Sequence, residues 1–444
     1  MRVKIEDKTL FMNAVKSILP KLNLCSINGL TIDSRKVEPG DIFLPLRGNK
    51  VDGHDFISEA ELLGASITII EKDINCSMPT YRVNSNKKLL YKLANEYRQQ
   101  LTYPLLGITG SNGKTTTKDL LVHILSSEMN IAHTKGNYNS TTGANLSIFQ
   151  FDSNADIGIV EMGANKPGEI ELLCKTIEPN MGLITNINFA HIANFNSQVQ
   201  IAETKSAIFK YLPNDGTAFI NLDDPFISEM ETNCKRIEYS LNVSSDYYGE
   251  WIEDTQSYKI NQFPIELSYY SQSMIINVLA AFSIALELGC MPSAVISRLK
   301  SFKVRQGRGR IIELNTHTII DDSYNANLTS MQFGILSLSK MSNNRRKIVV
   351  LGDMLELGSK AIEHHKFLGR FLNKCDIDAI FAYGELIELS IQEVHKKEKL
   401  YYKYFSDKDL LIHELNNYLG TNDIIYIKGS RSMHMEDIIT GLSS

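Results

Sequence analysis

The sequence predicts an α/β protein of three domains, and three observations lead to this fold class. At roughly 100–200 residues per domain, a chain of 444 residues makes two to four domains. From residue 105 onward, apolar runs typical of short strands alternate with helical patterns, as in a mostly parallel sheet covered by helices. A Gly/Arg-rich segment, RQGRGR (305–310), divides this alternation into two stretches. We therefore expect domains at residues 1–100, 101–303 and 304–444.

Composition and charge exclude several classes of protein. Apolar residues make up 43% and charged residues 22%, which is ordinary globular usage and excludes a disordered, coiled-coil or collagen-like chain. The net charge of −5 argues against a protein that mainly binds nucleic-acid backbones. The cysteines form no CxxC pair, so neither a zinc cage nor a dense disulfide framework is indicated, and a reducing compartment is favoured. They are Cys25, Cys76, Cys174, Cys234, Cys290 and Cys375.

Neither of two apolar stretches has the pattern of a targeting or membrane signal. The N-terminus, MRVKIEDKTLFMNAV, mixes charges through its apolar residues and lacks the h-region of a signal peptide. Residues 274–290 form the most apolar long stretch, but Asn277, Ser283 and Glu287 interrupt it, so it predicts a buried helix. We expect a soluble, cytoplasmic protein without membrane insertion.

The elements follow in order along the chain. In the first domain, 67–70 predicts a strand and 87–98 a helix with apolar residues near 3.6 spacing, and Pro104 ends a linker because proline cannot continue a helix. A helix is predicted from 115 to about 127. Further strands are predicted at 105–108, 157–162, 181–187, 217–221, 318–321, 347–351, 379–383 and 423–427. Ligands of such open parallel sheets bind beyond the carboxyl ends of the strands.

A glycine-rich turn, Gly107–Thr116 (GITGSNGKTT), lies between a predicted strand and a predicted helix. Gly110 and Gly113 allow a tight turn in which successive backbone N–H groups point at phosphate oxygens, and the following helix adds the positive end of its dipole. Lys114 is placed to reach β- and γ-phosphates, and the Thr115 hydroxyl can ligate Mg²⁺. The turn predicts a nucleoside triphosphate site.

The general P-loop pattern has a glycine where this chain has Ile108. A strand–turn–helix corner with glycines for geometry alone is the alternative interpretation, and the lysine and threonine directly after the last glycine argue against it. We expect nucleotide contacts from Thr109, Gly110, Ser111, Asn112, Gly113, Lys114, Thr115 and Thr116.

Three further polar residues lie on or directly after predicted strands and helices of the same domain. Glu161 ends the apolar run 157–160, so its carboxylate lies beside the phosphate loop, where it can hold a Mg²⁺ that bridges phosphate oxygens. His191 follows the next strand and, taken alone, is a structural histidine. Lys205 lies on a helical pattern and, taken alone, is a surface lysine.

Candidate nucleotide ligands also occur around the start of the third domain. The Arg308 guanidinium can neutralise γ-phosphate charge, and the Asp322 carboxylate, which follows a strand, can accept ribose hydroxyls. Arg310 is a rival for the arginine role because RQGRGR permits either register. Asn277, taken alone, is a hydrogen-bonded polar residue within an apolar helix.

Eight ordered segments resemble the Mur ligase family of ATP-dependent amide-bond ligases, which also includes the folylpolyglutamate synthases. Besides the G-x-T-G-S-N-G-K-T-T loop, the matching segments are TIDSRKVEPGDIF (31–43), VDGHDF (51–56), TKGNYN (134–139), EMGANKPGEI (161–170), ITNINFAH (184–191), DDSYNAN (321–327), LGDMLELG (351–358) and KGSRSMHME (428–436). The resemblance implies a central P-loop, parallel-sheet ATPase domain between an N-terminal α/β domain that binds a UDP-sugar and a C-terminal Rossmann-like α/β domain.

Within that family, the segments are most similar to members that add D-alanyl-D-alanine to UDP-N-acetylmuramoyl-tripeptide during peptidoglycan precursor synthesis. The resemblance implies ATP and two Mg²⁺ ions as cofactors, an acyl-phosphate intermediate and a monomer. It implies that Glu161, His191 and a carbamylated Lys205 hold metal with Thr115, and that Lys114 and Arg308 act on the phosphates. It also implies adenine contact by Asn277 and substrate binding by Ser34, Arg35, Asp52, His54, Asn137, Asn139, Asn325, Asn327, Lys428 and Arg431.

Alternatives remain open at this point. A sibling ligase that adds the third peptide residue, or a folylpolyglutamate synthase-like ligase, would share the phosphate loop, although no DNPR-like motif occurs in the third domain. A nucleotide-binding protein without ligase activity is a further alternative, because several positions depart from the family pattern. These are Ser140, Asn145, Asn188, Phe189, Ser273 and Leu328. The third residue of the tripeptide, lysine or diaminopimelate, is also left open.

Overall fold

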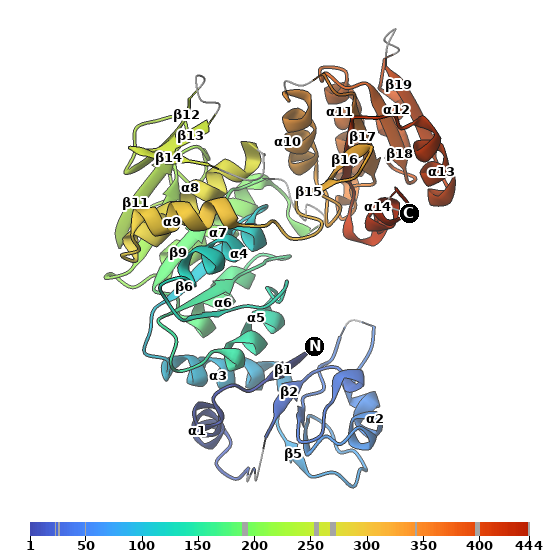
Figure 1. The fold of residues 1–444 in the computed structure, drawn as a ribbon. Coiled ribbons are helices and arrows are strands. Elements are labelled where there is room, and N and C mark those ends of the chain that lie inside the picture. The colour runs from blue at the N-terminus through green and yellow to red at the C-terminus, as the bar shows by residue number, and fades with distance from the viewer. Residues whose placement is uncertain are drawn as a thin grey trace.

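The chain forms three α/β units along its length, each built on its own sheet (Figure 1). A computed structural model describes residues 1–22, 24, 27–48, 50–188, 194–252, 257–266, 272–341, 344–395 and 400–442. The predicted fold class is confirmed. Cys25 lies outside the described residues, and the other five cysteines are free thiols. Within the described parts of the chain, no helix combines the length and apolar character needed to cross a bilayer.

The N-terminal sheet has the order β1-β2-β3-β4-β5, with β1 antiparallel to β2 and the remaining pairs parallel. Its strands are β1 (Arg2–Lys4), β2 (Gly29–Thr31), β3 (Ile42–Phe43), β4 (Ile67–Ile70) and β5 (Thr80–Arg82), and its helices are α1 (Lys8–Ile18), α2 (Ile57–Leu62) and α3 (Asn86–Gln99). Asp7 and Ser85 accept hydrogen bonds from first-turn amides of α1 and α3, which explains where these helices begin.

The central sheet has the order β14-β13-β12-β11-β10-β9-β6-β8-β7 among the described strands, and β7 to β12 are parallel. The strands are β6 (Leu105–Thr109), β7 (Ile131–His133), β8 (Ile157–Glu161), β9 (Met181–Ile184), β10 (Thr217–Asn221), β11 (Lys235–Ser240), β12 (Tyr247–Ile252), β13 (Ser257–Ile260) and β14 (Phe263–Ile265). The helices are α4 (Lys114–Leu125), α5 (Thr141–Ser147), α6 (Glu169–Ile177), α7 (Gln198–Lys210), α8 (Gln272–Glu287) and α9 (Pro292–Ser301).

Helices cover both faces of the central sheet. Leu120 of α4 and Phe282 of α8 belong to one buried apolar cluster, and Leu173 of α6 and Ile208 of α7 belong to another. The strand predicted at 181–187 ends earlier, at Ile184, because the following residues hydrogen-bond to the glycine-rich turn. This arrangement puts the carboxyl ends of β6, β8 and β9 side by side, as the family of open parallel sheets requires.

The C-terminal sheet has the order β15-β16-β20-β17-β18-β19, parallel apart from the edge strand β15. Its strands are β15 (Arg310–Glu313), β16 (His317–Asp321), β17 (Lys347–Gly352), β18 (Ala379–Tyr383), β19 (Tyr401–Phe405) and β20 (Asp423–Lys428). Its helices are α10 (Leu328–Ser339), α11 (Ala361–Leu372), α12 (Glu388–Gln392), α13 (Lys408–Tyr418) and α14 (Glu436–Leu442). One apolar cluster includes Ile335 and Leu368 and the other includes Leu411 and Ile438, so helices cover both faces.

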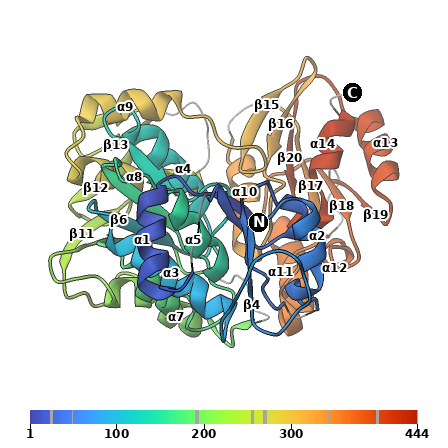
Figure 2. The same cartoon turned by 90° about the horizontal axis from the view of Figure 1, so that it is seen from below.

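Helices α1 and α3 of the N-terminal unit pack directly on the central unit (Figures 1 and 2). Phe149, fully buried next to α5, lies 5.1 Å from the Phe11 ring and 5.4 Å from the Tyr97 ring, both in edge-to-face geometry. The buried Arg98 of α3 donates hydrogen bonds to the backbone oxygens of Ile177 and Glu178 in the central unit. The first two units therefore share one apolar core.

Replacing Phe149 by Ala removes the ring at which α1 and α3 meet the central unit. A buried Phe→Ala change costs about 3–5 kcal/mol, so we expect a marked fall in the urea concentration at the first unfolding midpoint. Phe367 of α11 is 47% exposed and serves as control, since its replacement by Ala stays within about 0.5 kcal/mol. Equal midpoints for the two variants would contradict the shared core.

Candidate functional site

The glycine-rich turn joins β6 to α4 in a conformation that only glycine adopts without strain. Gly110 has φ +145° and Gly113 has φ +82°, and Gly113 is the residue before the first turn of α4. A side chain at Gly110 would collide with the Thr185 side chain, and a Cβ at Gly113 would lie 2.9 Å from the Asn277 amide. The local sequence therefore fixes how closely the turn, the β9 loop and α8 approach one another.

The residues after β9 form hydrogen bonds with the glycine-rich turn, a feature that the sequence did not reveal. The Ser111 amide donates to the Asn186 carbonyl over 2.9 Å, and the Asn112 amide donates to Asn186 Oδ1 over 3.0 Å. Thr185 Oγ1 donates to the Asn112 carbonyl over 2.6 Å. These two amides are therefore used inside the protein rather than being directed at a ligand.

The first turn of α4 carries the remaining amides of the loop. The amides of Gly113, Lys114, Thr115 and Thr116 make no hydrogen bond to any described acceptor. Open amides and the positive end of the helix dipole together make an anion-binding position. Lys114 Nζ donates to the Gly110 carbonyl over 2.7 Å, which keeps the ammonium beside these amides. Burial, opposed by the Glu161 charge, lowers the Lys114 pKa.

Glu161 lies beside this position, at the carboxyl end of β8, and its side chain is 1% exposed. Its Oε1 accepts hydrogen bonds from Thr115 Oγ1 over 2.9 Å and from Asn139 Nδ2 over 2.6 Å. Its Oε2 has no hydrogen bond and lies 3.5 Å from Lys118 Nζ. A buried carboxylate oxygen without a hydrogen bond, next to a threonine hydroxyl, fits a Mg²⁺ ion, which prefers oxygen ligands.

Lys118 and Asp119 are functional candidates that the sequence reasoning missed. Lys118 is fully buried and its Nζ donates to the carbonyls of Thr134 and Gly136, over 2.9 Å each. Asp119 lies 3.5 Å from Lys118 Nζ and 2.7 Å from the Arg305 guanidinium, and burial raises its pKa. The signal was present, because Lys118 lies one helical turn after Lys114 on the same face of α4.

Lys205 of α7 is buried, which corrects its interpretation as a surface lysine. It is 4% exposed and lines the same cavity as the phosphate loop. Within the described residues its Nζ has neither a hydrogen bond nor an ion pair. Burial, reinforced by the nearby Lys114 charge, holds the Lys205 pKa well below its usual value. A lowered pKa favours the neutral amine, which is the form that reacts with CO₂. His191 lies outside the described residues.

The C-terminal unit forms the wall of the cavity that faces the phosphate loop. Arg308 lines the cavity with its guanidinium 3.7 Å from the Tyr324 ring centroid, whereas Arg310 begins β15 and is exposed. Burial lowers the Arg308 pKa, and the charges of Tyr324, Asp322 and Glu161 oppose that shift. Asp322 Oδ2 accepts hydrogen bonds from Lys428 Nζ over 2.6 Å and from the Tyr426 hydroxyl over 2.7 Å.

Among the described residues, three polar side-chain contacts join the central and C-terminal walls of the cavity. Asn137 Nδ2 donates to the Tyr324 hydroxyl over 2.9 Å, and Asn327 Nδ2 donates to Asn112 Oδ1 over 2.7 Å. The third is the ion pair between Arg305 and Asp119. Together the walls enclose a cavity of about 1210 Å³. Its lining includes the loop residues 110–116, Asn137, Asn139, Glu161, Lys205, Asn277, Arg308, Asp322, Asn325, Asn327, Lys428 and Arg431.

Some predicted residues of this wall are paired within the protein. Arg431 forms an ion pair with Glu436 over 2.7 Å, and its side chain is 55% exposed. Asn325 is exposed, and Asn327 caps α10 through its side chain. Among the described residues, no three His, Cys, Asp or Glu side chains form a metal cluster.

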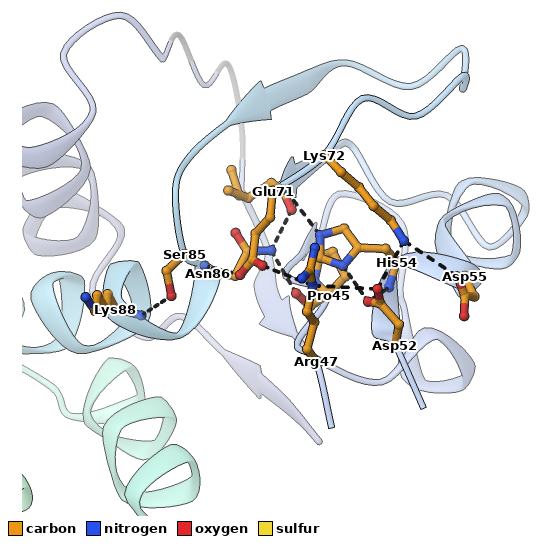
Figure 3. Close-up of polar contacts among 11 residues, drawn as sticks. Pro45, Arg47, Asp52, His54, Asp55, Glu71, Lys72, Ser85, Asn86 and Lys88 are labelled. Carbon is orange, nitrogen blue, oxygen red and sulfur yellow. Dashed lines mark hydrogen bonds and ion pairs between the residues drawn. The ribbon is translucent and has the colours of Figure 1, made fainter. Parts of the chain in front are cut away.

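The N-terminal candidates form a separate group, and none of the four lines the cavity. His54 is buried: its Nδ1 is 2.6 Å from Asp52 Oδ1, and its Nε2 accepts a hydrogen bond from the Glu71 amide over 3.2 Å (Figure 3). Both ring nitrogens are therefore satisfied inside the chain. Although burial acts to raise it, the Asp52 pKa is lowered by hydrogen bonds from His54 and Lys72.

Around His54, charged side chains remain accessible. Lys72 Nζ donates to Asp52 over 3.0 Å, and Arg47 lies 3.3 Å from the Glu71 carboxylate (Figure 3). The other pair of candidates is at the end of β2, where Ser34 is buried and Arg35 is exposed. The Arg35 hydrogen bond lowers the pKa of Asp33 to about 2. This unit thus presents exposed cations next to ordered loops.

Comparisons with known protein families cover most of the chain. The Mur ligase middle domain matches residues 108–285, the Mur ligase glutamate ligase domain matches residues 307–431, and the Mur ligase catalytic domain matches residues 26–103. A UDP-N-acetylmuramoyl-tripeptide–D-alanyl-D-alanine ligase of Bacillus subtilis is 30% identical, over 95% of this chain and 94% of the relative. The ligase of the same name from Escherichia coli is also 30% identical, over 94% of each chain.

Solved structures agree with this result. A crystal structure of MurF from Acinetobacter baumannii superposes with a TM-score of 0.87 at 28% identity, over 99% of this chain and 100% of that one. A MurF ligase of Thermotoga maritima, solved in complex with ADP, gives a TM-score of 0.83 at 28% identity, over 95% and 97% of the two chains.

A matched pair of glycines tests the anion-binding position. Gly113 and Gly168 both have φ +82° and both precede a helix, but only Gly113 faces another side chain closely. Alanine at either position costs about 1–2 kcal/mol of backbone strain. We expect Gly113→Ala to weaken ATP binding about tenfold or more in calorimetric titration, because Asn277 or α4 must shift. Gly168→Ala retains wild-type affinity, and equal affinities in the two variants would contradict this assignment.

Proposed function

Because this chain belongs to the Mur ligase family, we propose that it is the ATP-dependent ligase that adds D-alanyl-D-alanine to UDP-N-acetylmuramoyl-tripeptide. The products are ADP, phosphate and UDP-N-acetylmuramoyl-pentapeptide, a peptidoglycan precursor. One observation carries the proposal: the phosphate loop, Glu161, Lys205 and Arg308 converge on a single cavity between two units. We further propose that the enzyme is a cytoplasmic monomer.

The reaction requires activation of a carboxylate, which is a poor electrophile because its leaving group would be oxide. A carboxylate oxygen of the tripeptide attacks the γ-phosphorus of ATP, ADP leaves, and an acyl phosphate forms. The amine of the dipeptide then attacks the acyl carbon, and inorganic phosphate leaves from the tetrahedral intermediate while the amine nitrogen loses its proton. Phosphoryl transfer of this kind depends on positioning and charge stabilisation more than on covalent chemistry.

The proposed roles on the phosphates follow from position and charge. The open amides at the start of α4 and the Lys114 ammonium bind the β- and γ-phosphates, and the Arg308 guanidinium stabilises the charge on the transferred group. Thr115 and Glu161 would hold Mg²⁺, with the hydrogen-bond-free Glu161 Oε2 supporting this role. The ion would supply charge neutralisation between phosphate oxygens.

We propose that Lys205 is carbamylated and that it and His191 would hold a second Mg²⁺. An ammonium would repel a cation, whereas a carbamate offers an anionic oxygen. The burial and lowered pKa of Lys205 support its reaction with CO₂ as a neutral amine. The carbamate forms when the amine nitrogen adds to the carbon of CO₂ and releases one proton.

The remaining contacts concern the nucleoside and the two peptide substrates. Asn277 is proposed to contact adenine. Asp322 is proposed to accept ribose hydroxyls through Oδ1, since the hydrogen bonds from Tyr426 and Lys428 both use its Oδ2. Lys428 and Arg431 are proposed to meet substrate carboxylates. Asn137, Asn139, Asn325 and Asn327 line the cavity, and we propose that they contact the substrate. Ser34, Arg35, Asp52 and His54 are proposed to shape the UDP-sugar site, with His54 acting through its neighbours because its ring nitrogens are occupied.

Lys114→Ala tests the proposed function directly. We expect kcat/KM for ligation to fall by on the order of 10²–10³-fold, because one preorganised charge on the phosphates is lost. The assay combines ATP, Mg²⁺, UDP-linked tripeptide and D-Ala-D-Ala, and detects the pentapeptide by mass spectrometry. Joining at an undiminished rate would refute the proposal, and stimulation of phosphate release by a single amino acid instead of the dipeptide would identify a sibling ligase.

Lys205→Ala tests carbamylation. We expect ligation to fall strongly and to recover in part when a short carboxylic acid such as acetate is added, because its carboxylate can occupy the space of the lost carbamate. Lys210→Ala, an exposed lysine at the end of the same helix, serves as control and keeps the wild-type rate. Unaltered activity of Lys205→Ala before the addition would contradict the assignment.

A further inference from the structure

We propose that Tyr324 is a positioning residue that fixes the Arg308 guanidinium toward the phosphates and, through its hydroxyl, joins that arrangement to the phosphate-loop unit. This inference rests on the proposed function, in which Arg308 acts on the transferred phosphate. Tyr324 belongs to none of the buried apolar clusters of the C-terminal unit, so its ring is not needed to fill that core. It lines the cavity instead.

The ring of Tyr324 determines where the Arg308 guanidinium can lie. The guanidinium carbon is 3.7 Å from the ring centroid, which is close stacking for a planar cation on an aromatic face. The charges of Lys114 and Glu161 from the central unit and of Asp322 from its own unit also act on this cation, so the stack holds it where the two walls meet. Without the ring, a long arginine side chain would have several rotamers open to it.

The turn that carries Arg308 is built against the same tyrosine. The Tyr324 amide donates to the Gly307 carbonyl over 3.0 Å, and the Gly307 amide donates to Asp321 Oδ2 over 2.7 Å. Gly307 has φ +77°, and a Cβ there would lie 3.0 Å from the Tyr324 Cβ. Backbone and ring together therefore place the arginine, with the glycine allowing the close approach.

The hydroxyl of Tyr324 joins this arrangement to the other wall. It accepts a hydrogen bond from Asn137 Nδ2 over 2.9 Å, across two units. The loop that carries Asn137 is held by Lys118 through the carbonyls of Thr134 and Gly136, and it continues to Asn139, which donates to Glu161. The hydroxyl therefore bonds to the same loop that orients the proposed metal ligand, and this bond exists only while the units are together.

Two variants separate the ring from the hydroxyl. Tyr324→Phe keeps the stack and loses the bond to Asn137, and we expect kcat for pentapeptide formation to fall about 3–10-fold with little change in the KM for ATP. Tyr324→Leu loses both, and we expect a fall of about 100-fold. Tyr383 is the matched control, because the Lys408 ammonium lies beside its ring but the residue does not line the cavity. We expect Tyr383→Phe and Tyr383→Leu to keep the wild-type kcat.

A binding ratio distinguishes positioning from a loss of stability. Arg308 acts on the γ-phosphate, so we expect the ratio of the dissociation constants for ADP and for a non-hydrolysable ATP analogue to fall in Tyr324→Leu and not in Tyr383→Leu. Urea midpoints show whether each variant is folded. If Tyr324→Leu does not fold, Tyr324→Phe and the next measurement decide.

The double variant Asn137→Ala/Tyr324→Phe tests the bond itself. We expect its kcat to be no lower than that of the worse single variant, because both changes remove one interaction. The inference would be overturned if the kcat losses of the two single variants multiplied in the double variant. It would also be overturned if Tyr324→Leu kept the wild-type kcat and binding ratio. Absence of pentapeptide from the wild-type enzyme would instead count against the proposed function, and the binding ratio would still test Tyr324.

Discussion

The burial of the Glu161 carboxylate at the carboxyl end of β8 is the constraint on which the site depends. A buried carboxylate is costly unless its oxygens have partners, and here the partners come from different parts of the chain. Thr115 brings the start of α4, Asn139 brings the loop after β7, and Lys118 brings the middle of α4. Satisfying one carboxylate thus fixes the phosphate loop and the neighbouring loop relative to the sheet, while one oxygen stays without a hydrogen bond.

The C-terminal unit, which forms the other wall of the cavity, is joined to the central unit by fewer and weaker contacts than those around Glu161. Apart from the helix contact between α8 and α10, the described side-chain bonds across the joint are Asn137–Tyr324, Asn112–Asn327 and Arg305–Asp119. Two are neutral hydrogen bonds and the third includes a half-exposed arginine, so each contributes on the order of 1 kcal/mol. We propose that such a joint opens for substrate and product exchange and closes for chemistry. Closure also excludes water, which would hydrolyse an acyl phosphate.

The N-terminal unit has a different relation to the site. Its core is continuous with that of the central unit through Phe149 and Arg98, so it is held firmly, yet its candidate residues lie away from the cavity. This arrangement suits a substrate that spans a distance, with one end held by the N-terminal unit and the reacting carboxylate at the phosphate loop. The buried His54 links the Asp52 side chain to the Glu71 backbone at the end of β4, and Arg47 and Lys72 stay accessible.

The sequence by itself determined several local features: the predicted strands and helices to within a few residues, the glycine turn, Glu161 at the end of a strand and the family resemblance. These follow from periodicity, backbone preferences and contiguous motifs, which act over short stretches of chain. Other elements, such as β11 to β14, were not predicted. Only the tertiary structure decided that Lys205 is buried and that Arg308 rather than Arg310 faces the cavity. It also decided that the amides of Ser111 and Asn112 donate hydrogen bonds to Asn186 in the loop after β9. It also revealed Lys118 and Tyr324. Each of these depends on groups distant in sequence meeting at one point, and burial, charge and hydrogen-bond partners at such a point are properties of the packed chain.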